Sequence, residues 1–169
     1  MIGKGLGFGG VLGRPEIVVR TASVDDAAAI AAIHGESFRR GWSDGEIEAL
    51  IRQDNVAALA AECRNVFGHR STAGFVLYRT AADEAEILTV AVSQASRRHG
   101  VGRALMEEAI RRLYTERIGS LFLEVDSGNG AAIALYKALD FVRVGERSGY
   151  YAQGATAARG ALVMRRDIR

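Results

Sequence analysis

A short basic stretch, residues 96–105, has the residue types and spacing of an anion-binding turn. It reads SRRHGVGRAL, so three arginines and a histidine surround Gly100 and Gly102. The stretch follows an apolar, strand-like run and opens a helical pattern, and the first N–H groups of a helix lack intrahelical partners. These groups lie at the positive end of the helix dipole, which favours a phosphate as ligand. A purely structural turn explains the glycines about equally well.

Other nucleotide and nucleic-acid readings of this stretch fit less well. A dinucleotide fingerprint needs a third glycine three residues after the second, where Leu105 stands. The G-x-x-x-x-G-K-S/T phosphate loop occurs nowhere in the sequence. The 22 Lys and Arg residues exceed the 20 Asp and Glu residues by only two, so the chain has no large positive field. Aromatic residues that could stack on bases are absent from residues 97–103, and we therefore expect no direct nucleic-acid binding.

A glutamate in an apolar segment is a candidate general base. In residues 120–127, SLFLEVDS, strand alternation places Leu121, Leu123 and Val125 on one face and Phe122 and Glu124 on the other. Partial burial would raise the pKa of the Glu124 carboxyl toward a range useful for proton transfer. The alternative is an edge-strand glutamate that points to water.

Tyr136 and Asn129 have simple structural explanations. Tyr136 has Ala132, Ile133 and Leu139 at helical spacing, so its residue context alone favours a core aromatic with a satisfied hydroxyl. Asn129 stands at the start of the same predicted helix, where it suits the N-cap.

The cysteine and the histidines suggest neither a disulfide nor a metal site. Cys63 is the only cysteine, which excludes an intramolecular disulfide and fits a reducing, cytoplasmic compartment. It reads as a buried structural thiol rather than a nucleophile. His34, His69 and His99 lack metal-ligand spacing, so we expect no metal. No apolar run reaches the roughly twenty residues of a membrane span, so we expect a soluble, unexported protein without a membrane partner.

Capping and periodicity predict where helices and strands lie. Ser23 and Ser43 suit helix N-caps, the second with Glu46 completing a capping box. From Gly102 onward, apolar residues recur at helical spacing. Helices are predicted over 23–38, 43–53, from 102 onward and over 129–140, and strands over 16–23, 55–62, 72–80, 84–93, 120–127, 141–151 and 160–168.

This order of elements predicts a single α/β domain with a mixed sheet. The first half favours an antiparallel meander, whereas strand–helix–strand–helix–strand in the second half predicts parallel pairing through right-handed crossovers. The chain length suits one domain. We assign residues 17–169 to it and residues 1–16, which are rich in glycine, to a flexible arm.

The segment Arg97-Arg98-His99-Gly100-Val101-Gly102 resembles the R/Q-x-x-G-x-G/A signature of the GNAT acyltransferases, in the expected place between a strand and a helix. LEVDSGNGAAIALYKALDF, residues 123–141, is similar to the second conserved block of RimI-type ribosomal-protein alanine N-acetyltransferases. The resemblance continues to the C-terminus. It implies a twisted, mostly antiparallel sheet of about six to seven strands, flanked by about four helices.

The resemblance also implies a co-substrate, acetyl-CoA, and a role for individual residues. Glu124 would be the general base, and the Tyr136 hydroxyl would protonate the departing thiolate. The remaining roles concern binding. The residues implied to bind acetyl-CoA are Val90, Ala91, Val92, Arg97, Arg98, His99, Gly100, Val101, Gly102, Arg103 and Asn129, and those implied at the acceptor site are Trp42, Tyr150 and Tyr151.

The implied acceptor is a protein N-terminus, namely the alanine of a small-subunit ribosomal protein. If the protein is an acetyltransferase, the alternative acceptors are protein lysines or a small amine. If it is not an enzyme, the alternative is a non-catalytic acyl-CoA sensor. The oligomeric state is left open. Arg40 and Gly41 replace the family's Phe-Pro pair before Trp42, and Ala152 replaces the proline after the two tyrosines, which affects the acceptor more than the chemistry. Asp140 stands where the family has glycine, and aspartate tolerates that left-handed position.

Overall fold

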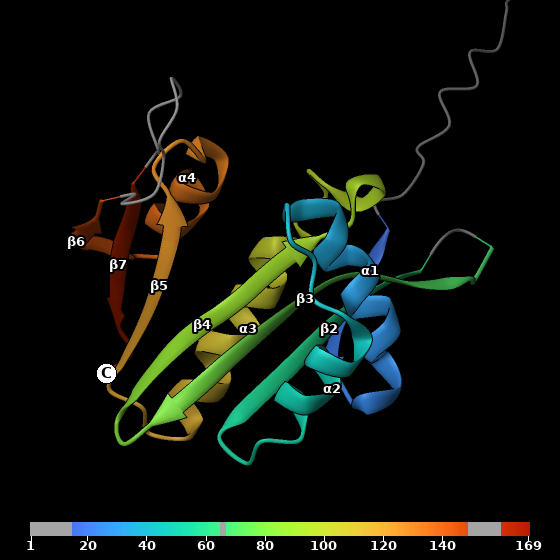
Figure 1. The fold of residues 1–169 in the computed structure, drawn as a ribbon, viewed down its shortest axis with the longest axis horizontal. Coiled ribbons are helices and arrows are strands. Elements are labelled where there is room, and N and C mark those ends of the chain that lie inside the picture. Colours follow the sequence, from blue (N-terminus) through green and yellow to red (C-terminus); the bar gives the residue numbers. More distant parts are fainter. Residues whose placement is uncertain (1–14, 65–66, 149–159) are drawn as a thin grey trace, which may run out of the picture.

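The computed structural model describes residues 15–64, 67–148 and 160–169. These residues form seven strands, four α-helices and two short 3-10 turns (Figure 1). The strands are β1 (Glu16–Thr21), β2 (Val56–Arg64), β3 (Arg70–Ala81), β4 (Glu84–Val92), β5 (Ser120–Asp126), β6 (Val142–Arg147) and β7 (Ala161–Asp167). The helices are α1 (Ala27–Ser37), α2 (Asp44–Ile51), α3 (Val101–Thr115) and α4 (Gly130–Ala138), and the turns are η1 (Val24–Asp26) and η2 (Gln94–Ser96).

The strands form one sheet in the order β1-β2-β3-β4-β5-β7-β6. Every neighbouring pair is antiparallel except β4 and β5, which confirms the mixed, mostly antiparallel sheet. The prediction of parallel pairing throughout the second half was wrong beyond β5. The last strand, β7, inserts between β5 and β6 and pairs antiparallel with both.

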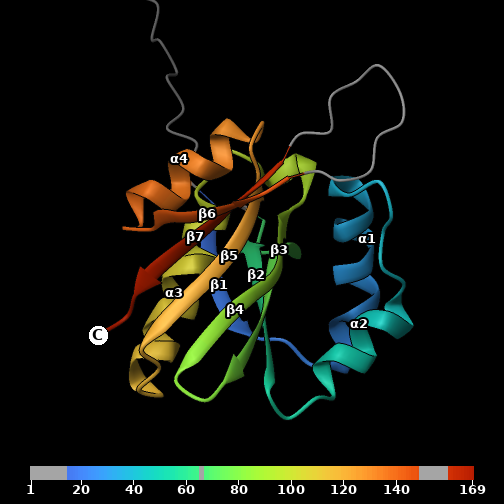
Figure 2. The same cartoon turned by 60° about the vertical axis from the view of Figure 1, so that its left-hand side comes forward.

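Helices cover both faces of the sheet, but not equally (Figure 2). On the α3/α4 face, α3 buries the predicted stripe of Leu105, Met106, Ala109 and Leu113 against strands from both halves of the sheet. On the opposite α1/α2 face, the helices pack on β2, β3 and β4 through a second core that includes Phe75 and Leu77. No helix of the described residues is long and apolar enough to cross a membrane.

Local capping signals position the first two helices as the sequence predicts. Ser23 and Asp26 form a capping box at η1, which leads directly into α1, and Ser43 and Glu46 form one at α2. After α4, Asp140 adopts a positive φ of 64°, the left-handed conformation expected there.

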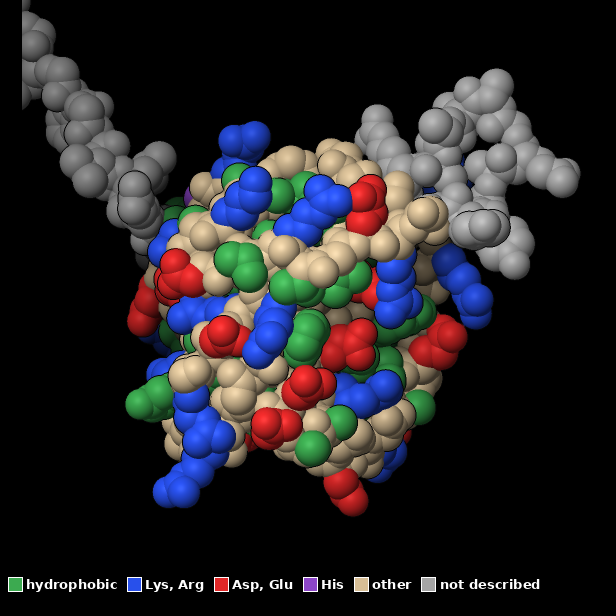
Figure 3. Space-filling model, turned by 90° about the vertical axis from the view of Figure 1, so that its left-hand side faces the viewer, with side chains coloured by type: hydrophobic (Ala, Val, Ile, Leu, Met, Phe, Trp, Pro, Cys, Tyr) green, Lys and Arg blue, Asp and Glu red, His purple; other side chains and the backbone are tan. Residues whose placement is uncertain are grey.

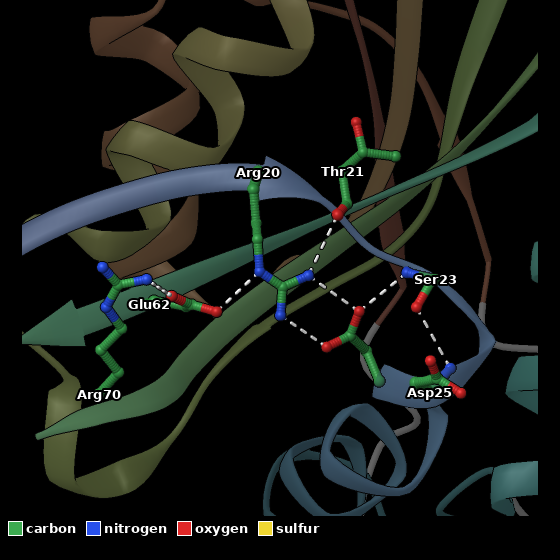
Figure 4. Close-up of polar contacts among 7 residues, drawn as sticks. Arg20, Thr21, Ser23, Asp25, Glu62 and Arg70 are labelled. Atoms are coloured by element: carbon green, nitrogen blue, oxygen red, sulfur yellow. Dashed lines mark hydrogen bonds and ion pairs between the residues drawn. The ribbon is translucent and has the colours of Figure 1, made fainter.

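Ion pairs of Arg20 connect the turn before α1 to the sheet (Figure 4). The Arg20 guanidinium contacts both carboxylate oxygens of Asp26, at 2.7 and 2.9 Å, and donates from Nε to Glu62 on β2 at 2.7 Å. Hydrogen bonding to Arg20 lowers the pKa of the Asp26 carboxyl, so the aspartate stays charged. Arg20 therefore fixes the helical layer against the sheet edge.

Candidate active site

The sheet opens between β4 and β5. These strands pair only where Glu84–Glu86 meets Ser120–Phe122, and beyond this point they diverge (Figure 1). Two residues further along, the register of β3 with β4 passes from Tyr78–Ile87 to Leu77–Thr89, so Leu88 is an extra, bulged residue. A bulge bends its strand and increases its twist. We attribute the divergence of β4 from β5 in part to this bulge.

The diverging part of β4 presents an unpaired strand edge to the opening. Ser93 N–H donates to Ala73 O on β3 at 2.8 Å. Because successive residues of a strand point their N–H and C=O groups to opposite sides, those of Val90 and Val92 face the opening. Arg97 Nε contacts the Val92 carbonyl at 3.3 Å. Such an edge can hydrogen-bond an extended ligand as a further strand would.

The predicted anion-binding turn lies at the end of this edge. Gly100, with φ of 85°, caps α3, and Arg98 also has a positive φ of 62°. The first hydrogen bond of the helix joins Ala104 N–H to Gly100 O at 3.0 Å. The N–H groups of Val101, Gly102 and Arg103 precede it and are not used within the helix. The geometry is that of a helix start able to bind phosphate.

Side chains around this turn connect it to α1 and α3. Gln94 N–H donates to Glu36 at 2.8 Å, and the Arg97 guanidinium contacts the Ser37 hydroxyl at 3.3 Å. Arg103 pairs with Glu107 at 2.8 Å. Arg98 and His99 are exposed at the turn. The backbone and these two side chains are thus the parts of the turn most available to an anion.

Glu124 lies on β5 on the α1/α2 face, beyond the point where β4 departs. Its Oε1 forms an ion pair with Nε of Arg147 on β6, at 2.8 Å. Both side chains line a pocket of about 290 Å³, together with Arg79, Glu86 and Phe122. The Glu124 side chain is 38% exposed, so it is only partly buried and its other partner is solvent. The α1 and α2 helices do not extend over this part of the sheet.

Tyr136 lies on α4, on the opposite face of the sheet. Its ring packs in the core and contacts Phe141 at a centroid distance of 5.8 Å, so the predicted core packing is confirmed. The side chain is only 6% exposed, and burial raises the pKa of its hydroxyl to about 12. The hydroxyl is therefore protonated at neutral pH and can donate a proton. Asn129 caps α4, accepting from Ala132 N–H at 3.1 Å.

Trp42 lies between α1 and α2 and is held by His34. The backbone N–H of Trp42 donates to His34 Nδ1 at 3.1 Å, and the indole and imidazole rings stack with their centroids 4.6 Å apart. Phe38 stacks on His34 at 4.3 Å. Burial lowers the pKa of His34, with the charge of Glu46 acting in the opposite direction. A neutral His34 leaves Nδ1 free to accept this hydrogen bond.

Comparisons with known proteins agree with this geometry. The Acetyltransferase (GNAT) family matches residues 27–141. The chain belongs to this family. The [Ribosomal protein bS18]-alanine N-acetyltransferase of Escherichia coli (strain K12) is 40% identical over 79 residues, which are 47% of this chain and 53% of that protein. The chain thus matches about half the length of this relative.

Two further similarities extend over more of the chain. The N-alpha-acetyltransferase RimI of Mycobacterium tuberculosis is 37% identical over 116 residues, 64% of this chain and 70% of that protein. The crystal structure of the ribosomal-protein-S18-alanine N-acetyltransferase from Escherichia coli superposes with a TM-score of 0.78 and 26% identity, covering 90% of this chain and 94% of that one. The GNAT fold and the RimI-type resemblance are both confirmed.

The sequence analysis did not identify two residues that shape the candidate site of this GNAT domain, Gly74 and Arg147. A Cβ added at Gly74 would lie 2.8 Å from Ala91 O, so this glycine allows β3 to approach β4 closely. An isolated glycine within a strand pattern was the available signal. Arg147 lies 23 positions beyond its partner Glu124 in the sequence, and no local pattern connects them.

The remaining predictions concern Tyr150, Tyr151, Cys63 and metals. Tyr150, Tyr151 and residues 1–14 of the glycine-rich arm lie outside the described residues, whereas Glu16 already belongs to β1. Cys63 is partly rather than fully buried on β2, and burial raises the pKa of its thiol, which does not favour a nucleophile. Within the described ranges, no group of three or more His, Cys, Asp or Glu side chains could hold a metal ion.

Acidic and basic side chains are interspersed on the face shown in Figure 3.

Proposed function

We propose that this protein is a cytoplasmic, acetyl-CoA-dependent N-terminal acetyltransferase that modifies the alanine of a small-subunit ribosomal protein. The observation that carries the proposal is the split between β4 and β5, where an open strand edge leads into the glycine start of α3 and Glu124 lies across the gap. The identity of the acceptor is inferred from the similarity to the ribosomal-protein alanine N-acetyltransferase of Escherichia coli.

The open edge of β4 suits the extended, amide-containing arm of acetyl-CoA. The backbone of the segment Val90–Val92 would bind this arm, with the polar groups of Val90 and Val92 facing it. The amides from Arg98 to Arg103 would bind the pyrophosphate, because they lie at the positive end of α3. The exposed side chains of Arg98 and His99 would add charge, and Asn129 would contact the co-substrate in addition to capping α4.

Glu124 and Tyr136, from opposite faces of the sheet, can assist direct transfer of the acetyl group from acetyl-CoA to the acceptor amine. The acceptor nitrogen forms a bond to the acetyl carbon while the carbon–sulfur bond breaks. Glu124 accepts a proton from the nitrogen, directly or through water, and Tyr136 donates one to the sulfur. Glu124 faces the side on which Trp42 and α1 lie, so the acceptor enters there, and Tyr136 belongs to the opposite layer.

A single carboxylate base suits an α-amine better than a lysine. An α-amine with a pKa near 8 is roughly 10% free base at neutral pH, whereas a lysine with a pKa near 10.4 is less than about 0.1% free base. This difference corresponds to roughly 3.4 kcal/mol of additional deprotonation cost for a lysine.

The test compares two matched peptides with purified protein and acetyl-CoA. One peptide begins with a free alanine, and the other has the same sequence with a blocked N-terminus and an internal lysine. We expect mass spectrometry to find acetyl only on the α-amine of the first. In cells lacking the gene, the N-terminal alanine of the ribosomal protein should lose its acetyl group. Acetylation of the lysine peptide instead, or loss of acetyl from lysines or a small amine in those cells, would contradict the proposal.

A further inference from the structure

Arg147 is placed beside the proposed base by tertiary structure alone. In the register of the sheet, Glu124 lies opposite Val163 of β7, and Arg147 lies opposite Ala161, two residues away on the same face of β7. The two side chains therefore reach diagonally across β7 on the α1/α2 face and meet at 2.8 Å, from Arg147 Nε to Glu124 Oε1. Among the described residues, no helix packs over this part of the sheet to hold Glu124 in place.

We propose that Arg147 is a positioning residue that holds the Glu124 carboxylate in the orientation needed to accept a proton from the acceptor amine. The proposal rests on the proposed function, because it assumes that Glu124 is the base. The contact is made through one carboxylate oxygen, Oε1, and among the described residues no hydrogen bond engages Oε2, which can accept from the amine or a bridging water. A base whose position is fixed by a second group is a recurrent arrangement in proton-transfer sites.

The surroundings of Glu124 explain why it needs such a partner. Its side chain is 38% exposed, and an exposed carboxylate on a strand has several rotamers open to it. The other charged groups that line the pocket are Arg79, Glu84 and Glu86. The two glutamates repel Glu124, whereas Arg79 attracts it from the β3 side and Arg147 from the β6 side. Because β6 lies beyond β7, on the side of β5 away from the opening, the contact holds the carboxylate over β7 on the sheet surface rather than in solvent.

The strand that carries Arg147 also supplies a matched control. Arg143 lies on β6 and pairs with Glu146 at 2.5 Å, also through a surface ion pair. Arg143 lies opposite Met164, whose side chain is in the core on the α3/α4 face, so Arg143 points away from Glu124. Arg143→Ala therefore removes the same type of side chain and the same type of contact without affecting the proposed base.

The experiment measures peptide acetylation by Arg147→Ala with and without added guanidinium ion, at concentrations too low to unfold the protein. We expect kcat to fall about tenfold or more, as for a misplaced catalytic group, with the KM for acetyl-CoA unchanged. Guanidinium should restore part of kcat, and Arg147→Lys should lie between the variant and the wild type. Arg143→Ala should keep the wild-type kcat and not respond to guanidinium.

Four outcomes separate this inference from the proposed function. A wild-type kcat for Arg147→Ala overturns the inference. So does a loss that neither guanidinium nor Arg147→Lys recovers, because the role would then be merely structural. If Glu124→Gln is itself fully active, the proposed base fails and the inference fails with it. An inactive Glu124→Gln together with an unaffected Arg147→Ala leaves the proposed function standing. Arg147 is 74% exposed, so its removal should leave the fold intact, which thermal unfolding checks.

Discussion

The two halves of the sheet are built differently. Strands β3 and β4 pair along nearly their whole length, from Gly74–Val92 to Ala81–Glu84, and β1 and β2 extend the same antiparallel arrangement. The second half, β5-β7-β6, joins the first through only three paired positions between β4 and β5. Helices α1 and α2 cover one face of the first half, whereas the same face of the second half carries Glu124, Arg147 and the pocket.

This difference separates stability from chemistry. In the first half, backbone hydrogen bonds are made within the sheet and apolar side chains are buried on both faces, so few polar groups are left for a ligand. At the junction, β4 has an unpaired edge and charged residues face an open surface. A continuous sheet would have closed the site, so the short β4–β5 pairing gives up some ladder hydrogen bonds to make room for substrates.

The largest expected effect is on catalysis at the junction. Glu124→Gln should lower kcat by about 10²- to 10⁴-fold, the usual contribution of a general base. Its free energy of unfolding should change by less than about 0.5 kcal/mol, because the residue is partly exposed. Release of CoA thiol from acetyl-CoA in the presence of acceptor peptide measures the first, and urea unfolding the second. Equal rates for wild type and variant would remove Glu124 as the base.

A matched pair of phenylalanines tests the difference in packing. Phe75 of β3 is fully buried under α1 and α2, whereas Phe122 of β5 lies on the same face without a helix over it, with the Arg165 guanidinium 5.7 Å from its ring centroid. Phe75→Ala should lower the free energy of unfolding by about 3–5 kcal/mol. Phe122→Ala should cost about 1 kcal/mol. Urea denaturation of both variants measures the contrast, and equal losses would show that the halves contribute alike.

The start of α3 allows backbone and side-chain contributions to be separated. A Cβ at Gly102 would lie 3.6 Å from Leu135 and from Val92, which is ordinary contact, so Gly102→Ala should fold normally. It should nevertheless raise the KM for acetyl-CoA about tenfold, because the methyl group keeps the pyrophosphate from amides that donate to a charged group. Arg98→Ala removes an exposed charge and should raise this KM less than about fivefold. A larger effect from Arg98→Ala would show that the side chain dominates the turn.

The smallest effect concerns pH and the segment that carries Trp42. Burial lowers the pKa of His34 in the folded protein below its unfolded value of about 6.5. Below pH 6.5, His34 binds a proton in the unfolded chain but not in the folded chain. Acidification should therefore lower the free energy of unfolding by at most about 1.4 kcal/mol per pH unit. His34→Gln should lose less stability than wild type between pH 7 and pH 5, by urea unfolding at each pH. Parallel losses would show that His34 does not contribute.

Most of the local structure could be predicted from sequence. Ser23 and Ser43 mark their caps, and the apolar stripe of α3 identifies its buried face, because these signals depend on residues within about one or two turns of each other. The glycine turn before α3 and the left-handed Asp140 follow for the same reason: each depends on the conformation of one residue and its neighbours. The resemblance to GNAT acetyltransferases rests on this same contiguous region.

Only the tertiary structure decided how these elements form a site. The insertion of β7 between β5 and β6 and the short β4–β5 pairing are choices of register between distant strands, and periodicity within one strand does not specify its neighbour. The Leu88 bulge depends on how β4 meets β3. The contacts of Glu124 with Arg147 and of His34 with Trp42 follow from that packing. The sequence by itself determined the elements and the candidate residues, because these are encoded locally. The opening in the sheet and the partner of Glu124 arise from long-range pairing and twist, which only the folded chain brings together.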